Sequence, residues 1–454
     1  MPIQLMLLGL LATSAGRAAI DRPALAEVDA YLQSEIAPDT PGAAVMLVDH
    51  GEIVFAKGYG LANVAEHVPV TPQTVFDVGS VSKQFTAMAI MMLAEQGELS
   101  YDDSLSKFLP EFPAYAANIT VRHLLHHTGG LPDYMAAFER TRRFAPGFMP
   151  TTHDAVRLLA EQPRPDFAPG DQWAYSNSGY VVLAAIVEAA SGQRFPDFVR
   201  ENIFEPLGMR HSLVMDENVQ TAANRAISYA REATGFTDID AHPLNLIYGD
   251  GAVNTTIEDL FLWDQALATE KLVKASTREL AFTSGKRNDG TDTGYGFGWA
   301  VGQFFGRRCV SHGGAWVGFR AFIMRLPAQE FSVVIEANLA QADPEAMAKR
   351  VARIYLHAQL ELPQPVAVAA SVLASCVGEY DLERGGSITI TRTADGRLHL
   401  SAPGNRDLAL LASSSREFFG DGREDVRVSF ECSGDRVTGL VYHTAVDRQA
   451  RKVK

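Results

Sequence analysis

The sequence predicts an α/β fold, in which an antiparallel sheet is flanked by helices and carries an inserted helical region, followed by a small all-β barrel domain. The chain has 454 residues, more than one hydrophobic core usually serves. Its predicted elements run from strands to helices and back to strands, which indicates a helical block between the first and last strands of one sheet. After residue 362 the pattern changes to short strands separated by turns.

The first half of the chain begins with a hairpin and continues with helices. Two apolar runs, at residues 43–48 and 52–59, flank the turn Asp49-His50-Gly51 and predict a β-hairpin. Residues 80–95 are almost continuously apolar and are followed by Gly97, a residue typical of helix C-termini, so they predict a buried central helix. Helical apolar spacing predicts further helices at residues 22–36, 152–161 and 180–190.

Strand signals return in the second half. Three strands are predicted at residues 295–301, 309–324 and 331–338. A helix at residues 344–359 is followed by a segment, 362–370, whose two prolines disfavour helix and predict a linker. We therefore place one domain at residues 20–362 and a second at 371–454. Alternating strands typical of a small antiparallel barrel or sandwich are expected at residues 387–392, 397–401, 408–412, 426–432 and 436–443.

The composition narrows the class of protein. Hydrophobic residues make up 47% and charged residues 21%, as in soluble globular proteins. A formal net charge of −14 disfavours nucleic acid and anionic membrane surfaces, because both attract clustered lysine and arginine. We therefore expect a small-molecule or peptide substrate and no nucleic-acid partner. No cofactor is expected either. The oligomeric state is left open.

The N-terminus predicts export. Residues 1–12 are largely apolar and residues 13–19 are mostly small, as in a signal peptide, although a positively charged start is missing. No cysteine follows directly, so we expect a periplasmic or secreted protein without a stable membrane anchor after processing. The three cysteines, Cys309, Cys376 and Cys432, have no metal-ligand spacing. Whether Cys376 and Cys432 form a disulfide or stay buried free thiols is open.

One tetrapeptide at the start of the predicted central helix has the form of a nucleophile and its base. Residues i and i+3 share a helix face, so Ser80 and Lys83 are neighbours. At a helix N-terminus, aligned peptide dipoles favour negative charge developing near the serine, and apolar surroundings help the lysine lose its proton. A helix-capping serine followed by an ordinary lysine has the same spacing, so this motif is not specific by itself.

Two further motifs follow in order. Tyr175 and Asn177 are two residues apart in a segment expected to be extended, so both are expected to face a cleft, where the phenol acts as a base and the amide holds lysine and substrate. The segment from His312 to Ala315 contains two glycines at the start of a predicted strand, where a substrate backbone can lie close. We expect the backbone N–H groups of Ser80 and Ala315 to form an oxyanion hole.

Together, Ser80-x-x-Lys83, Tyr175-x-Asn177 and His312-x-Gly314 resemble the three ordered motifs of the serine β-lactamase-like superfamily. This superfamily includes class C β-lactamases, penicillin-binding carboxypeptidases, D-aminopeptidases and related esterases. The resemblance covers about residues 25–360 and implies a β-lactamase/transpeptidase-like fold. It also implies that Ser80, Lys83 and Tyr175 are catalytic and that Asn177, His312, Gly314 and Ala315 bind substrate. The C-terminal residues resemble the lipocalin-like barrels appended to some members.

The third motif departs from the β-lactamase pattern, which usually has Lys-Thr-Gly or Lys-Ser-Gly. Here it reads His312-Gly313-Gly314, and a neutral imidazole offers one donor and no full charge to a substrate carboxylate. The His-x-Gly form resembles D-aminopeptidases and some esterases, so we expect a peptidase, amidase or esterase acting through an acyl-enzyme. Two alternatives are a β-lactamase or D-Ala-D-Ala carboxypeptidase, and a penicillin- or peptidoglycan-binding sensor without turnover.

Other motifs have weaker functional meaning. His123, His126 and His127 lack a nearby carboxylate or cysteine at zinc spacing, and we expect them to order the loop 128–134 instead of binding a metal. The segment 294–298 is glycine-rich but lacks the rest of a nucleotide-binding motif, so a strand is expected there. The loop 248–252 either lines the cleft or simply begins a helix.

Overall fold

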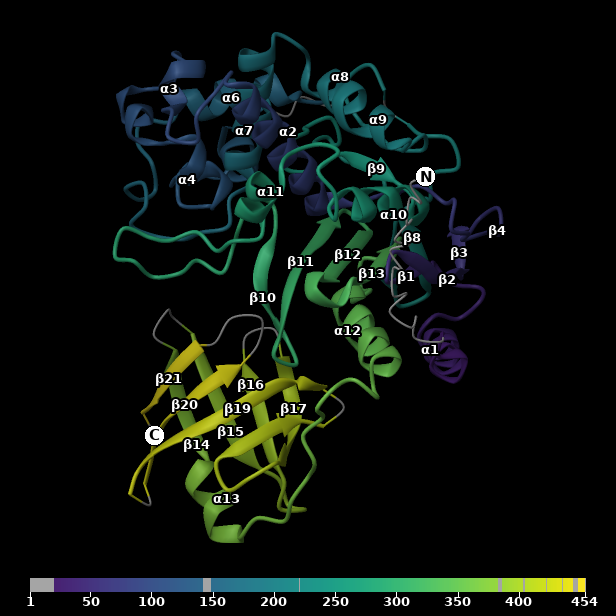
Figure 1. Cartoon of the computed structure of the whole chain (residues 1–454), viewed down its shortest axis with the longest axis vertical. Coiled ribbons are helices and arrows are strands. Elements are labelled where there is room, and N and C mark those ends of the chain that lie inside the picture. Colours follow the sequence, from purple (N-terminus) through teal and green to yellow (C-terminus); the bar gives the residue numbers. More distant parts are fainter. Residues whose placement is uncertain are drawn as a thin grey trace, which may run out of the picture.

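A computed structural model describes residues 20–141, 148–219, 221–382, 386–402, 405–421, 423–434, 436–443 and 448–453. The predicted signal peptide, residues 1–19, lies outside the described residues. The elements form an α/β unit and a β-barrel, and the barrel is drawn beneath the α/β unit in Figure 1.

The α/β unit is built on a six-stranded antiparallel sheet with the order β10-β11-β12-β13-β1-β2. Its strands are β1 (Ala43–Asp49), β2 (Glu52–Tyr59), β10 (Ala300–Phe304), β11 (Arg307–Trp316), β12 (Phe319–Leu326) and β13 (Phe331–Ala337). The first two and the last four strands of this sheet are far apart in sequence, and helices fill most of the chain between them. The predicted α/β fold with an inserted helical region is confirmed.

Strand β1 is apolar on both faces because both faces of the sheet are covered. Val45 and Leu47 belong to a core formed with α1 (Arg22–Glu35) and α12 (Pro344–Tyr355), which pack against one another. Met46 points to the opposite face and belongs to a larger core formed with the helical block. Because side chains alternate between the two faces of the strand, β1 contributes to two separate hydrophobic cores.

The centre of the helical block is α2 (Lys83–Gln96), which follows the short helix η1 (Gly79–Ser82) and packs against α7 (Asn177–Ser191). Gly97 ends α2 in the left-handed conformation, with φ of 80°, as its position predicts. The remaining helices are α3 (Leu105–Phe108), η2 (Ala114–Asn118), α4 (Val121–Leu125), α5 (Tyr134–Thr141), α6 (Thr152–Ala160), α8 (Phe195–Val199), η3 (Arg200–Phe204), α9 (Glu205–Leu207), α10 (Ile257–Ala266), α11 (Ala275–Ala281) and η4 (Pro327–Gln329).

Short strands join the block to the sheet. They are β3 (Leu61–Asn63), β4 (Val68–Pro69), β5 (Phe76–Asp77), β6 (Leu213–Val214), β7 (Tyr229–Glu232), β8 (Gly235–Asp238) and β9 (Val253–Thr255). Of these, β5, β9 and β6 form one small sheet that leads directly into η1.

Three predicted boundaries are wrong for local reasons. The strand expected at 309–324 is two strands, β11 and β12, because the chain turns at Val317 with φ of 43°. The strand expected at 295–301 begins only at Ala300, after left-handed turns at Gly294 and Gly298. Helix α7 begins three residues earlier than expected, because the Ser176 side chain accepts a hydrogen bond from the backbone of Gly179.

The C-terminal unit is a closed eight-stranded antiparallel barrel, preceded by the short helix α13 (Ala370–Cys376). Its strands are β14 (Gly378–Leu382), β15 (Ser387–Arg392), β16 (Leu398–Ala402), β17 (Asn405–Ala412), β18 (Glu417–Gly420), β19 (Arg423–Ser433), β20 (Arg436–His443) and β21 (Arg448–Lys452). The predicted barrel is confirmed, but α13, β14, β18 and β21 were not predicted from the sequence. Aromatic rings pack inside the barrel, with Phe418 edge-on to Phe430 at 5.4 Å between centroids. Cys376 and Cys432 are both free thiols of this unit.

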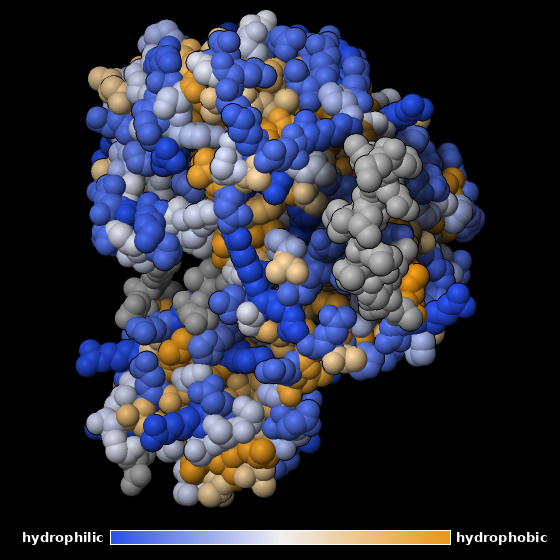
Figure 2. All heavy atoms as spheres, viewed as in Figure 1, coloured by the Kyte–Doolittle hydropathy of each residue, from blue (hydrophilic) through white to orange (hydrophobic). Residues whose placement is uncertain are grey.

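The α/β unit contacts the barrel at the tip of the β10–β11 hairpin, where the Arg427 guanidinium of β19 lies over the ring of Phe305. The linker also binds the barrel, because the Val366 backbone donates to the carbonyl of Ala412. Hydrophilic side chains cover most of the face in Figure 2, and hydrophobic ones gather there in small groups. Among the described residues, no helix has both the length and the apolar character needed to cross a bilayer.

Candidate active site

The turn before α2 fixes the position of Ser80. Gly79 adopts φ of 50°, and its backbone N–H donates to the buried carboxylate of Asp77 at 2.8 Å. The backbone of Val78 and the hydroxyl of Ser82 both bind the backbone of Val253, which anchors the turn to β9. Ser80 therefore lies within the first turn of a helix, where a backbone N–H has no partner inside the helix.

Strand β11 passes directly over this turn. A Cβ on Gly314 would lie 1.8 Å from the carbonyl oxygen of Val78, and one on Gly79 would lie 2.6 Å from the backbone nitrogen of Ala315. Only residues without a side chain allow so close an approach. The two backbone segments that carry Ser80 N and Ala315 N are thus packed against one another, as an oxyanion hole requires.

The β11 segment over the turn also has a free edge. Strand β10 pairs with β11 only from Arg307 to Ser311, while β12 pairs with β11 as far as Trp316. The stretch from His312 to Trp316 is therefore open on one side, where a substrate backbone can pair with it.

Lys83 joins three separate segments at one point. Its side chain is fully buried, and Nζ lies 3.0 Å from Ser80 Oγ, 2.9 Å from Asn177 Oδ1 and 2.8 Å from the carbonyl oxygen of Asp250. Three acceptors match the three donors of an ammonium, and a neutral amine could instead accept the proton of the serine hydroxyl over the same 3.0 Å. The structure thus brings Ser80, Lys83 and Asn177 together as the sequence predicted.

Tyr175 and Asn177 reach the site from different local structures. The expected extended segment is wrong at Asn177, which is the first residue of α7. Tyr175 precedes the helix and is 43% exposed, and its ring centroid lies 4.9 Å from Lys83 Nζ. Both side chains nevertheless face Lys83, because the Ser176 cap turns the chain between them.

His312 is buried, and burial, followed by the nearby Lys83 charge, lowers the pKa of its imidazole to about 3. The ring is therefore neutral. Nδ1 lies 2.6 Å from the carbonyl oxygen of Gly313 and must carry the hydrogen, so Nε2 accepts from the Tyr295 hydroxyl at 2.7 Å. The donor that was expected to be free for a substrate is therefore used within the protein.

The ring of His127 packs against Tyr175. Its Nδ1 accepts from the backbone of Ser176 at 3.1 Å, and its ring lies 4.4 Å from the ring centroids of both Tyr175 and Tyr295. Burial lowers the pKa of this imidazole well below 6.5, so the ring packs as a neutral aromatic. Neither His127 nor Tyr295 was predicted from the sequence to support the site.

The expectation that the three histidines order the loop 128–134 by hydrogen bonding holds at the start of the loop, where the His123 carbonyl accepts from the Thr128 backbone at 2.8 Å, but the imidazole rings bind other segments. The ring of His126 binds the carbonyl of Tyr295 at 2.9 Å, and that of His123 accepts from the backbone of Thr120. The His126 and His127 bonds tie the end of α4 to the segments around residues 295 and 176, whereas the His123 bond closes the N-terminal cap of α4. Each ring serves packing within the helical block.

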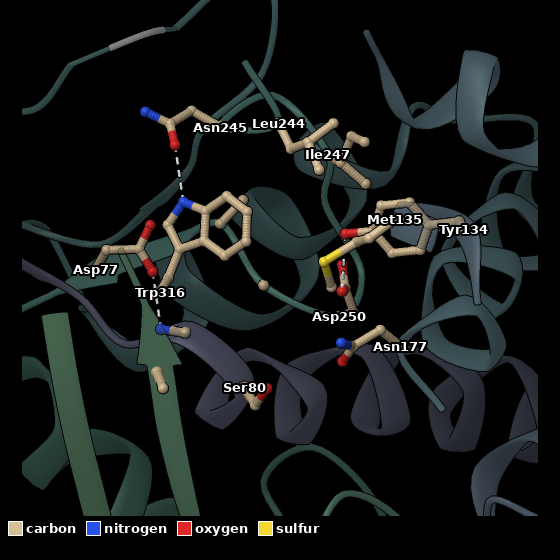
Figure 3. A pocket seen from close by; sticks show the side chains of 14 residues that line it. Asp77, Ser80, Tyr134, Met135, Asn177, Leu244, Asn245, Ile247, Asp250 and Trp316 are labelled. Atoms are coloured by element: carbon tan, nitrogen blue, oxygen red, sulfur yellow. Dashed lines mark hydrogen bonds between the residues drawn. The ribbon is translucent and has the colours of Figure 1, made fainter. Parts of the chain in front are cut away.

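Two cavities meet at Ser80. The first is lined by Ser80, Asn177, Ala315, the loop 250–252 and apolar side chains that include Met135, Leu244, Ile247 and Trp316 (Figure 3). The second is lined by Ser80, Tyr175, His312 and the first residues of α12. The loop 248–252 thus lines the cleft, the first of its two predicted roles. A nucleophile between two cavities can attack a bond whose two halves lie on either side of it.

Comparison with known proteins gives consistent matches. The family model described as Beta-lactamase matches residues 27–357. Penicillin-binding protein 4* of Bacillus subtilis is 31% identical over 433 residues, covering 90% of this chain and 94% of that protein. A D-aminopeptidase of Gluconobacter oxydans is 27% identical over 320 residues, covering 69% of this chain and 58% of that protein. The solved octameric penicillin-binding protein homologue from Pyrococcus abyssi has a TM-score of 0.65 and 25% identity, covering 94% of this chain and 100% of that one.

Proposed function

The chain belongs to the Beta-lactamase family and is a serine hydrolase, and from this premise we propose that it cleaves amide or ester bonds through an acyl-enzyme at Ser80, as a peptidase, amidase or esterase of the D-aminopeptidase type. The observation that supports the proposal most directly is the buried Lys83 Nζ, placed 3.0 Å from the serine hydroxyl and 2.9 Å from Asn177. A lysine so close to a serine at a helix start can take its proton and return it.

The proposed reaction has two halves. Ser80 Oγ attacks the carbonyl carbon while its proton passes to the pair Lys83 and Tyr175, and the resulting oxyanion accepts from the backbone N–H groups of Ser80 and Ala315. The pair then protonates the leaving group, the carbon–nitrogen or carbon–oxygen bond breaks, and an acyl-enzyme remains. Water then attacks the acyl carbon while its proton passes to the same pair. The pair returns a proton to Ser80 Oγ as the acyl–oxygen bond breaks, which releases the acid and frees Ser80.

The two cavities divide the substrate between them. Tyr175 lines the second cavity, so a leaving group that takes its proton from Tyr175 lies there. The acyl half then occupies the first cavity, beside Asn177. This arrangement separates the specificity for the acyl half from the specificity for the leaving group.

The third motif supports amidase or esterase activity over β-lactam hydrolysis. The neutral His312 ring donates its hydrogen to the carbonyl of Gly313, so the third motif presents no cation and no hydroxyl to a β-lactam carboxylate. We expect faster hydrolysis of p-nitrophenyl acetate and D-alanine p-nitroanilide than of nitrocefin or a D-Ala-D-Ala peptide. Nitrocefin as the best substrate would favour the β-lactamase alternative.

A fluorophosphonate probe tests the nucleophile. We expect labelling of the wild type and of the control Ser34→Ala, whose serine is exposed on α1, and none of Ser80→Ala. Labelling that survives Ser80→Ala would refute the assignment. Labelling without turnover of any ester or amide would favour the sensor alternative.

We also propose export, with a small-molecule or peptide substrate outside the cytoplasm. The apolar run at residues 1–12 and the small residues after it support a cleaved signal peptide. Mass spectrometry of protein recovered from the periplasm or medium tests this, with a mature N-terminus near residue 20 expected. Retention of Met1 in protein confined to the cytoplasm would refute it.

A further inference from the structure

The neutral form of Lys83 acts as a base only when its lone pair points at the serine. A neutral amine has two N–H groups and one lone pair, and Nζ has three polar neighbours, Ser80 Oγ, Asn177 Oδ1 and the carbonyl oxygen of Asp250. The amide oxygen and the backbone carbonyl can only accept, so they take the two hydrogens. The lone pair is then left for the hydroxyl of Ser80. The Asp250 carbonyl therefore directs the base as much as Asn177 does.

A buried hydroxyl on α2 binds the loop that supplies this carbonyl. Thr86 is fully buried and lies three positions after Lys83, so the two side chains share a face of the helix. The Thr86 hydroxyl donates to the carbonyl of Gly249 at 2.6 Å, and Gly249 directly precedes Asp250. Helix α2 thus binds the loop at two successive residues, through Thr86 and through Lys83 itself.

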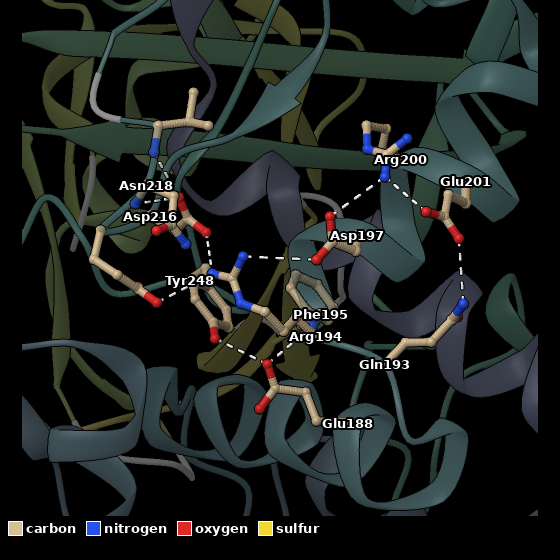
Figure 4. Close-up of polar contacts among 12 residues, drawn as sticks. Glu188, Gln193, Arg194, Phe195, Asp197, Arg200, Glu201, Asp216, Asn218 and Tyr248 are labelled. Atoms are coloured by element: carbon tan, nitrogen blue, oxygen red, sulfur yellow. Dashed lines mark hydrogen bonds and ion pairs between the residues drawn. The ribbon is translucent and has the colours of Figure 1, made fainter.

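The loop is also packed against α7, the helix that begins with Asn177. Gly249 adopts φ of 103°, and a Cβ there would lie 2.5 Å from a carbonyl oxygen of α7, which leaves no space for a side chain. One residue earlier, the Tyr248 hydroxyl donates to Glu188 of α7 at 2.9 Å (Figure 4). Helix α7 therefore positions both acceptors, Asn177 directly and the Asp250 carbonyl through the loop.

The attachment of the loop to α7 is itself fixed. Glu188 also accepts from the backbone of Phe195 at 2.8 Å and lies 2.9 Å from Nε2 of His153. The ring of Tyr248 stacks on Phe195 with 5.4 Å between centroids, beside the ion pairs of Arg194 (Figure 4). The loop is thus held on both sides before any substrate binds, which fits a preorganised support of the base.

We propose that Thr86 is a positioning residue of the reaction, which fixes the Asp250 carbonyl at Lys83 and so directs the lone pair of the base at Ser80. Within the described structure Thr86 lines neither cavity, so it acts through Lys83 and not on the substrate. Without its hydroxyl, the loop can move away from α2 and Nζ can turn an N–H toward the serine. Misplacement by about 1 Å can cost about 100-fold in rate. This inference rests on the proposed function, because it requires Lys83 to act as the base for Ser80.

The rate of Ser80 labelling by a fluorophosphonate tests this role. Thr86→Val keeps the shape of the side chain and removes the hydroxyl, whereas Thr86→Ser keeps the hydroxyl. We expect Thr86→Val to slow labelling at least about tenfold and Thr86→Ser to stay within about threefold of the wild type. Thr74→Val is the matched control and should label at the wild-type rate, because Thr74 is also buried but its hydroxyl accepts from the backbone of Thr71, at 2.9 Å.

A second background separates positioning from a general loss of folded protein. In Lys83→Ala the loop has no base to position, so adding Thr86→Val should slow labelling less than about twofold. Similar slowing in both backgrounds overturns the role of Thr86, as does wild-type labelling of folded Thr86→Val or a Thr86→Ser protein as slow as Thr86→Val. Should Lys83→Ala label too slowly to follow, the comparison of Thr86→Val with Thr86→Ser decides by itself.

A further variant covers the case in which Thr86→Val fails to fold. Tyr248→Phe removes the hydroxyl that ties the loop to Glu188, and it should slow labelling in the wild-type background and not in Lys83→Ala. Equal slowing in both, or none in either, overturns the positioning role of the loop and of Thr86 with it. Absence of Ser80 labelling in the wild type overturns the proposed function, whereas a labelled wild type that is insensitive to these changes overturns this inference alone.

Discussion

Substituting Gly314 by alanine should damage catalysis through the backbone alone. The new Cβ would lie 1.8 Å from the carbonyl oxygen of Val78, whereas real contacts of this kind stay above 3.0 Å. Strand β11 must therefore move away from the turn by the difference, about 1.2 Å, and it carries Ala315 N with it. Displacement of this size costs on the order of 100-fold in rate, and loss of one oxyanion donor costs roughly 100- to 1,000-fold in kcat.

The neighbouring glycine provides the control. A Cβ on Gly313 would meet only the Phe322 side chain, at 3.6 Å, and the carbonyl of Ala321, at 3.9 Å, both ordinary contacts. Steady-state kinetics with p-nitrophenyl acetate, alongside thermal unfolding by circular dichroism, should show a kcat loss of about 100-fold or more for Gly314→Ala and less than about tenfold for Gly313→Ala. Folded Gly314→Ala protein with kcat near that of the wild type would refute the close-packed oxyanion hole.

Three further predictions concern the base, the core and the barrel. Lys83→Ala should lower the acylation rate by at least about 100-fold in single-turnover assays, and wild-type acylation would point to Tyr175 as the only base. Glu336 is fully buried with no hydrogen-bond partner for its carboxyl among the described residues, and burial raises its pKa well above 4.5. As the pH rises, the unfolded chain therefore releases this proton before the folded chain does, and the free energy of unfolding falls above pH 4.5. Glu336→Gln removes the titrating group. It should reduce the fall, measured by urea titrations at pH 5 and 8, by about 1–3 kcal/mol. A steeper fall in the variant would contradict this. A chain ending at Leu362 should keep ester hydrolysis within about tenfold, because the residues lining both cavities precede it; a loss greater than this would show that the barrel supports the site.

The sequence predicted the parts of the fold that depend on local pattern. The hairpin of β1 and β2 and the Gly97 end of α2 follow from apolar runs and turn residues within a few positions. The division of the strand predicted at residues 309–324 into β11 and β12 was not predicted, because the turn at Val317 contains a β-branched residue in a left-handed conformation. No local propensity predicts such a turn.

The site shows the same limit. Ser80, Lys83, Tyr175 and Asn177 were identifiable because their spacing within short motifs carries chemistry. Asp250 has no such spacing, and it lies beside Lys83 only because a loop 167 positions away folds against α2. Tertiary contacts also supply His127 and Tyr295, whose rings look like ordinary core aromatics in the sequence.

The three partners of Lys83 have a consequence for the life of the chain before it is folded. Asn177 and Asp250 lie 94 and 167 positions from the lysine, so Lys83 acquires its surroundings only after most of the α/β unit has been made and packed. A polypeptide still emerging from the ribosome therefore carries Ser80 as an ordinary hydroxyl. Recovery of hydrolytic activity during refolding should thus report the last stage of folding without any label on the protein.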